Sequence, residues 1–254
     1  MAALLTMRGV VAGYGQATVL HGVDLEVGQG EVACLIGPNG AGKSTVLKTV
    51  SGLLRPRRGS IHLGDRPVHG LSPRAVLELG VVHVPQDRSL FPLMSVWENV
   101  LMGAYVVRDR AAVNRRIAEV AELFPIVGRR RHARAGSLSG GEQKLVELAR
   151  ALMLDPVLVL MDEPSIGLDP RARAQVFDSI RSMNESGRTV LLVEQNARSG
   201  LAAAHRASVM EAGVVKLEGT GAELLADPAV ARLYLGATTR QGLASPARTD
   251  GTTS

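Results

Sequence analysis

Residues 31–45 read EVACLIGPNGAGKST, an apolar run that passes through a glycine-rich loop into a helix-forming segment. The run EVACLI (31–36) is nearly continuous in apolar residues, as expected of a strand buried on both faces of a parallel sheet. The loop GPNGAGKST (37–45) fits the pattern G-x-x-x-x-G-K-[ST], and a helix is predicted to begin near Lys43. This strand–loop–helix order favours an α/β fold.

The loop has the chemistry of a triphosphate site. Its glycines let the backbone curl so that successive N–H groups converge on phosphate oxygens. Lys43 adds a positive charge for the outer phosphates, and the Ser44 hydroxyl can bind Mg²⁺. We therefore expect contacts to a nucleotide from Gly37, Pro38, Asn39, Gly40, Ala41, Gly42, Lys43, Ser44 and Thr45.

A pair of carboxylates ends a second apolar run, VLVLMDEPS (157–165). Strand ends in α/β proteins lie beside the ligand-binding loops of neighbouring strands. We expect Asp162 to hold the Mg²⁺ shell and Glu163 to polarise a water in line with the γ-phosphate. On their own, adjacent acids often only decorate a loop; the phosphate loop upstream favours the functional interpretation.

A second candidate phosphate seat lies in LSGGEQKLVELAR (138–150), where a serine and two glycines precede an amphipathic helix. Such a helix start offers unpaired N–H groups and the positive end of the helix dipole. The sequence therefore predicts two phosphate seats in one small domain.

The remaining pattern alternates strands with helices. Strands are predicted at 4–11, 18–27, 81–84, 157–162, 189–194 and 207–211, and a small hairpin at 59–68. From about 95 to 152 the pattern predicts helices, in the segments SVWENVLMGAYV, RAAVNRRIAEVAELF and the helix after LSGG. A last helix is predicted at about 228–235. The tail 238–254 is small, polar and unperiodic, so we expect it to be disordered.

Composition limits the class of protein. The chain has 254 residues, a net charge of +5 and only 3% aromatic residues, which argues against a base-stacking nucleic-acid platform. It has neither an apolar run long enough to span a membrane nor a predicted signal peptide. The single cysteine, Cys34, is expected to be a buried, inert thiol. The basic run GRRRHAR (128–134) is either a solvated turn or a contact for lipid headgroups or a partner.

Together, GPNGAGKST, LSGGEQ and VLVLMDEPSIGLD resemble the motifs of the ATP-binding subunit of an ABC transporter, over residues 4–236. The resemblance implies a P-loop NTPase core with a mixed, mainly parallel sheet, an antiparallel β subdomain and an α-helical subdomain inserted at about 90–152. It places one ATP-binding domain at 1–237, ahead of the tail at 238–254.

The resemblance also explains the second phosphate seat. Subunits of this family pair head to tail, so Ser139, Gly140 and Gly141 would contact the ATP held by a second ATP-binding subunit, identical or not. Asp169, in SIGLD, matches the loop that crosses this interface. Hydrolysis would then separate the two subunits.

Other site residues follow from the same resemblance. Tyr14 matches the aromatic residue that stacks on adenine, and Gln86 matches the glutamine that touches Mg²⁺. Phe91 and Trp97 lie in the segment where a membrane subunit would dock, although packing in the core is an equal alternative. Gln195 stands where most members have a histidine that contacts the γ-phosphate, and an amide cannot carry a proton or a charge there.

We therefore expect an ATPase with ATP and Mg²⁺ as ligands, peripheral to the cytoplasmic face of the plasma (inner) membrane. Its partners would be transmembrane permease subunits and, indirectly, a substrate-binding protein, with no nucleic acid. VEQN (193–196) and the ending ELLADPAVARLYLG resemble the subgroup that imports branched-chain amino acids, whereas VPQD (84–87) stands where that subgroup often has VPEG. The alternatives are transport of urea, amides or another small molecule, export, a soluble ATPase of DNA repair, or a nucleotide-binding module without catalysis.

Overall fold

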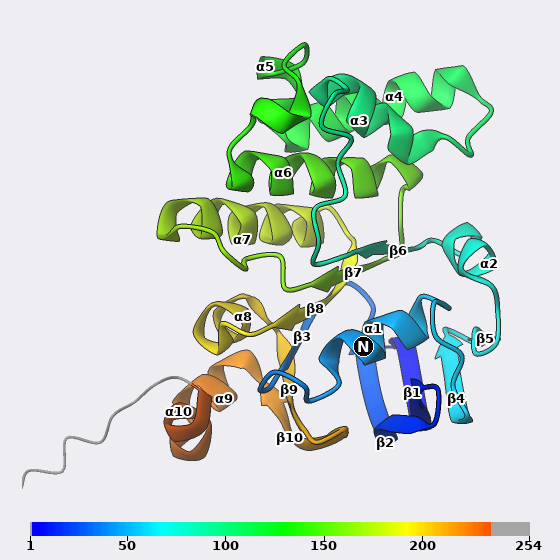
Figure 1. Cartoon of the computed structure of the whole chain (residues 1–254), viewed down its shortest axis with the longest axis vertical. Coiled ribbons are helices and arrows are strands. Elements are labelled where there is room, and N and C mark those ends of the chain that lie inside the picture. The colour runs from blue at the N-terminus through cyan, green and yellow to red at the C-terminus, as the bar shows by residue number, and fades with distance from the viewer. Residues whose placement is uncertain (1, 235–254) are drawn as a thin grey trace, which may run out of the picture.

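The computed structural model describes residues 2–234, which form two β-sheets and a group of helices that stands to one side of them (Figure 1). The tail predicted at 238–254, and the predicted end of the domain at 237, lie outside the described residues. Within residues 2–234, none of the helices combines the length and apolar character needed to cross a bilayer.

The central sheet has the strand order β10-β9-β3-β8-β7-β6. Strands β9, β3, β8, β7 and β6 run parallel, and β10 pairs antiparallel with β9. The predicted mixed, mainly parallel sheet is therefore confirmed. Its strands are β3 (Val32–Ile36), β6 (Val81–Val84), β7 (Leu158–Asp162), β8 (Thr189–Glu194), β9 (Arg206–Glu211) and β10 (Val214–Thr220).

Both faces of this sheet are covered, which explains why its inner strands are apolar without alternation. All five residues of β3 are buried, but they divide between two clusters. Val32, Cys34 and Ile36 belong to one cluster, and Ala33 and Leu35 belong to the other. The alternation of side chains along a strand thus supplies two hydrophobic cores from one apolar run.

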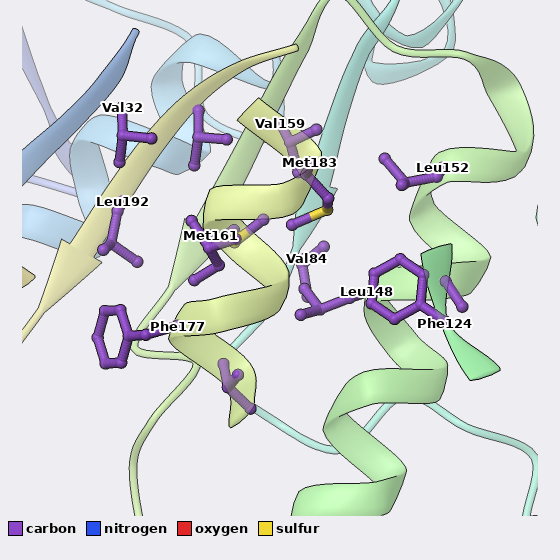
Figure 2. Close-up of a cluster of buried hydrophobic side chains, with 14 of the residues drawn as sticks. Val32, Val84, Phe124, Leu148, Leu152, Val159, Met161, Phe177, Met183 and Leu192 are labelled. Carbon is purple, nitrogen blue, oxygen red and sulfur yellow. The ribbon is translucent and has the colours of Figure 1, made fainter. Parts of the chain in front are cut away.

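The first cluster joins the central sheet to the helices (Figure 2). Met161 from β7 and Met183 from α7 lie between the sheet and Leu148 of α6, while Phe124 closes the far side. The helices around the central sheet are α1 (Lys43–Val50), α2 (Pro73–Glu78), α7 (Pro170–Glu185), α8 (Ala197–Ala203), α9 (Gly221–Ala226) and α10 (Pro228–Tyr234).

The second cluster lies under an antiparallel sheet of order β2-β1-β4-β5. Its strands are β1 (Ala3–Tyr14), β2 (Ala17–Gly28), β4 (Arg58–Leu63) and β5 (Arg66–Pro67), so the predicted antiparallel subdomain and the hairpin at 59–68 are both present. Helix α1 packs against β1, β2 and β7, between the two sheets (Figure 1).

The inserted helical subdomain is present and follows β6. It comprises α3 (Val96–Leu101), η1 (Met102–Ala104), α4 (Arg110–Leu123), α5 (Pro125–Arg129), η2 (Ala135–Ser137), α6 (Gly140–Ala151) and η3 (Leu152–Leu154).

The prediction of one helix over SVWENVLMGAYV (95–106) was wrong in its second half. The α-helix ends at Leu101 and continues as a 3₁₀ turn. Here Gly103 approaches the backbone of α6 so closely that a Cβ would lie 2.1 Å from the carbonyl oxygen of Arg150. The tight contact with α6 therefore takes precedence over continued α-helical geometry.

Candidate nucleotide site

The phosphate loop connects the end of β3 to the start of α1, as predicted. Gly40 and Gly42 have φ of +80° and +103°, a region that glycine enters without strain. Gly37 lies against β9, where a Cβ would stand 2.1 Å from the carbonyl oxygen of Met210. No side chain caps the first turn of α1, so its N–H groups remain available to an anion.

Lys43 is buried at 4% exposure and folds back over the loop. Its ammonium donates hydrogen bonds to the carbonyl oxygens of Gly37 (2.9 Å) and Pro38 (3.1 Å). It also forms an ion pair with Oε1 of Glu163 at 3.7 Å. The single cation of the loop therefore stands directly beside the candidate catalytic carboxylate.

The two adjacent acids diverge at the end of β7. Asp162 continues the strand and accepts a hydrogen bond from the Ser44 hydroxyl at 2.9 Å. Glu163 has φ +46°, a left-handed conformation that is rare for a residue with a side chain, and its N–H donates to the carbonyl oxygen of Val193. This turn directs the two carboxylates to different partners, as the sequence interpretation required.

The oxygen atoms of Ser44 and Asp162 suit Mg²⁺, which binds few protein ligands and completes its shell with phosphate and water. Among residues 2–234 no group of three or more His, Cys, Asp or Glu side chains is placed to bind a metal without a substrate. The donor set thus fits a cation that arrives with a triphosphate.

A cavity of about 490 Å³ opens over the loop. Half of the predicted site residues line it, including Gln86 from the segment after β6 and Gln195 from the segment after β8. The cavity therefore brings together residues from five separate parts of the chain. Its lining residues are Val19, Asn39, Gly40, Gly42, Lys43, Ser44, Thr45, Gln86, Glu163, Ile166 and Gln195.

Tyr14 lies outside the lining of this cavity, at the end of β1, and is 46% exposed. The second phosphate seat also lies outside it. Ser139 caps α6 by accepting a hydrogen bond from Glu142 N–H, and Glu142 accepts one from Ser139 N–H. Asp169 caps α7 through the N–H groups of residues 171 and 172. These two helix starts do not contact the phosphate cavity of their own chain.

Glu194, within VEQN, was not among the predicted site residues. This carboxylate is 1% exposed and accepts hydrogen bonds from Ser165 N–H (3.1 Å) and Asn196 N–H (3.3 Å). Burial, together with the negative charge of Glu163, raises the pKa of Glu194, and the hydrogen bonds oppose that rise. Glu194 therefore holds the loop that follows Glu163. A charged residue at the end of the buried-strand pattern TVLLVE (189–194) was the available signal.

The two aromatic residues left undecided have different environments. Phe91 is 47% exposed and lines a cavity of about 330 Å³ beside β6 and α6. Trp97 packs against the first hydrophobic cluster, with the Arg131 guanidinium 3.8 Å from its ring centroid. Phe91 thus faces a groove, whereas the half-buried Trp97 packs against the core. Arg129, Arg130 and Arg131 of the basic run are exposed at the end of α5.

Comparisons with known proteins point to one family. Residues 20–166 match the model of the family described as ABC transporter. The chain is 41% identical to the high-affinity branched-chain amino acid transport ATP-binding protein BraG of Pseudomonas aeruginosa, over 92% of this chain and 100% of BraG. It is 36% identical to the lipopolysaccharide export system ATP-binding protein LptB of Escherichia coli K12, over 92% and 98%.

Solved structures agree with this. The ADP conformation of MJ1267, an ATP-binding cassette of an ABC transporter, superposes with a TM-score of 0.84 at 28% identity, over 93% of this chain and 100% of that one. A dimeric, post-hydrolysis structure of the cassette MJ0796 bound to ADP and Pi superposes with a TM-score of 0.74 at 25% identity, over 85% and 98%.

Proposed function

This chain belongs to the ABC transporter family and is an ATPase, and on that premise we propose that it energises the uptake of branched-chain amino acids through separate membrane subunits. The observation that carries the ATPase assignment is the cluster of Lys43, Ser44–Asp162 and Glu163 around one cavity. The likeness to BraG along its full length supports the substrate class, as do VEQN and the ending at 223–236.

In this proposal the triphosphate binds along the loop 37–45. The N–H groups at the start of α1 and the Lys43 ammonium contact the phosphate oxygens and stabilise charge on the transferred group. Tyr14 stacks on adenine. Ser44, Asp162 and Gln86 would hold Mg²⁺, which would supply positive charge against the outer phosphates.

Glu163 acts as general base for the attacking water. Its position supports this role, since it is 7% exposed, faces the phosphate cavity and lies one residue beyond the residue assigned to Mg²⁺. Gln195 lines the same cavity and donates one hydrogen bond to the γ-phosphate from its amide. Because an amide stays neutral, Lys43 provides the positive charge that the site requires.

We also propose that two such subunits close head to tail around ATP. In support, Ser139, Gly140 and Gly141 do not line the cavity of their own chain, and the related cassette MJ0796 is dimeric when bound to ADP and Pi. Each α6 would then present its N-terminus to the nucleotide of the partner. Asp169 would lie in the loop that crosses between the subunits.

The groove lined by Phe91 is the proposed docking site for a transmembrane permease subunit, so that the chain is peripheral to the cytoplasmic face of the inner membrane. Its lining is largely apolar, with Val82, Val84, Met102 and Leu154 among the contributors. A substrate-binding protein would act on the permease from the opposite side of the membrane.

Replacing Glu163 by glutamine tests the mechanism. We expect Glu163→Gln to abolish phosphate release, retain ATP binding and accumulate an ATP-bound dimer on size-exclusion chromatography. Glu185→Gln, the same change at the exposed end of α7, is the matched control and keeps normal turnover. Wild-type rates of phosphate release in Glu163→Gln would show that Glu163 is not the base.

Export is the second candidate, because the match to LptB covers as much of this chain as the match to BraG. Genes adjacent to the coding region would identify cognate membrane subunits for reconstitution. Uptake of radiolabelled leucine into proteoliposomes, dependent on ATP and on a binding protein, is the expected result. ATP-dependent transport of another cargo, or in the opposite direction, would contradict the amino-acid import proposal and leave the ATPase assignment intact.

A further inference from the structure

The face of helix α1 that carries Ser44 continues toward Tyr14. Residues four apart lie on the same helix face, so Lys48 stands one turn beyond Ser44. Its ammonium lies over the Tyr14 ring, 5.8 Å from the ring centroid. The helix that begins at the phosphate loop therefore also contacts the aromatic residue assigned to adenine, and Figure 1 shows α1 beside the strands β1 and β2 that flank this residue.

The turn that carries Tyr14 is held by a second cation. Arg57 donates hydrogen bonds to the carbonyl oxygens of Gly15 (2.7 Å) and Ala17 (3.1 Å) and to the Thr18 hydroxyl (2.8 Å). Its own N–H donates to the carbonyl oxygen of Val11. The backbone on both sides of Tyr14 is thus fixed without a nucleotide.

These contacts leave Tyr14 oriented but accessible. Its residue surface is 46% exposed, while Lys48 is half-buried and covers the ring from the side of α1. A cation placed over an aromatic face within about 6 Å is attracted by the ring quadrupole. A ring held in this way loses less side-chain entropy when a flat base stacks on it.

We propose that Lys48 is a positioning residue for the binding of ATP. It holds the Tyr14 ring in the orientation in which the ring stacks on the base. The inference rests on the proposed function, because it needs Tyr14 to stack on adenine. Lys48 acts through the ring and not through the phosphates. Arg57 fixes the turn, and the two cations together preform the platform for the base.

The test compares a whole nucleotide with a phosphate chain that lacks the base and the sugar. Calorimetry measures the affinity of the purified chain for a non-hydrolysable ATP analogue with an imido bridge and for tripolyphosphate. In Lys48→Met, which keeps the length of the side chain and removes its charge, we expect about a two- to fivefold loss for the ATP analogue. Affinity for tripolyphosphate should not change, and Lys48→Arg should retain most of the binding of the analogue.

A double-mutant cycle shows whether Lys48 acts on ATP binding through Tyr14. In a Tyr14→Ala background, Lys48→Met should have no further effect on the ATP analogue. Lys216→Met, the same change at an exposed position of β10, is the control for net charge. Thermal melting without nucleotide confirms that each variant is folded.

Three results would overturn the inference: equal losses for the analogue and for tripolyphosphate, a Lys48→Met effect that persists in Tyr14→Ala, or no loss in Lys48→Met while Tyr14→Ala weakens binding. A failure of the underlying function is distinguishable. Tyr14→Ala with unchanged affinity for the analogue would refute adenine stacking itself, and Lys43→Ala with unchanged affinity would refute the phosphate seat.

Discussion

Glu194 offers a direct test of how the site is held in place. Its carboxylate is buried, and within residues 2–234 it forms no ion pair with a cation. Removing the side chain in Glu194→Ala leaves the N–H groups of Ser165 and Asn196 without an acceptor. Each buried polar group left without a hydrogen-bond partner lowers the free energy of unfolding by about 1–3 kcal/mol. The loss of both hydrogen bonds therefore predicts a fall of about 2–6 kcal/mol in the free energy of unfolding.

Glu194→Gln separates the charge from the hydrogen bonds. The amide oxygen replaces one carboxylate oxygen as acceptor, whereas the amide nitrogen faces the second N–H and cannot accept from it. We expect this variant to lose about 1–3 kcal/mol at pH 5, less than Glu194→Ala. Urea denaturation of the nucleotide-free chain measures both values, with the slope of the transition as the check on two-state unfolding.

The pH dependence has a definite sign. The pKa of Glu194 in the folded chain is raised above its ordinary value of 4.5, first by burial. At a pH between the ordinary pKa of the unfolded chain and the raised pKa of the folded chain, Glu194 is protonated in the folded chain and ionised in the unfolded chain. The stability that Glu194 contributes therefore falls as the pH rises through this range. Glutamine does not titrate, so the deficit of Glu194→Gln relative to wild type should shrink as the pH rises above 4.5. A deficit that stays constant or grows would refute the assignment of a raised pKa.

Three further outcomes follow from individual contacts. Cys34 is buried, and burial raises the pKa of its thiol, so thiol reagents at pH 8 should label the chain only after unfolding, as mass spectrometry will show. Gly37→Ala should lower the free energy of unfolding by several kcal/mol, because the new Cβ would meet the carbonyl oxygen of Met210. Gly40→Ala has open space around the new Cβ and should lower it by only about 1–2 kcal/mol, as urea denaturation will measure. Asp169→Ala removes the cap of α7 and should lose about 1 kcal/mol in the same assay, and an unchanged midpoint would argue against the cap.

The sequence predicts the central sheet well, because its strands are short apolar runs bounded by turns. The apolar runs at 31–36, 157–162 and 189–194 match β3, β7 and β8 closely. It did not predict α7, although Asp169 followed by Pro170 is a common helix start. That helix buries only Val176, Phe177, Ile180 and Met183, so its apolar stripe is narrow among charged residues. Strand β10 was missed for a related reason, since none of its residues is fully buried.

Some residues of the site can be predicted from their neighbours in the sequence, and others only from the folded structure or the family resemblance. The phosphate loop and the two carboxylates are predictable because each follows a buried strand. Gln86 and Gln195 could be placed only through the family resemblance, and the shared cavity with Lys43 appears only once β6 and β8 are assembled in one sheet. The Lys48–Tyr14 contact could not be predicted from the sequence, because no periodicity relates a residue of α1 to the end of strand β1.

The polar groups of the nucleotide-free site satisfy one another. Lys43 pairs with two loop carbonyl oxygens and with Glu163, and Ser44 pairs with Asp162. Buried polar groups require such partners, so the site is stable before substrate arrives. In the proposed function, an arriving triphosphate would take over the contacts of Lys43, which would remove this cation from beside Glu163. The proposed general base, Glu163, would then act only after the phosphate chain has displaced Lys43 from its carboxylate.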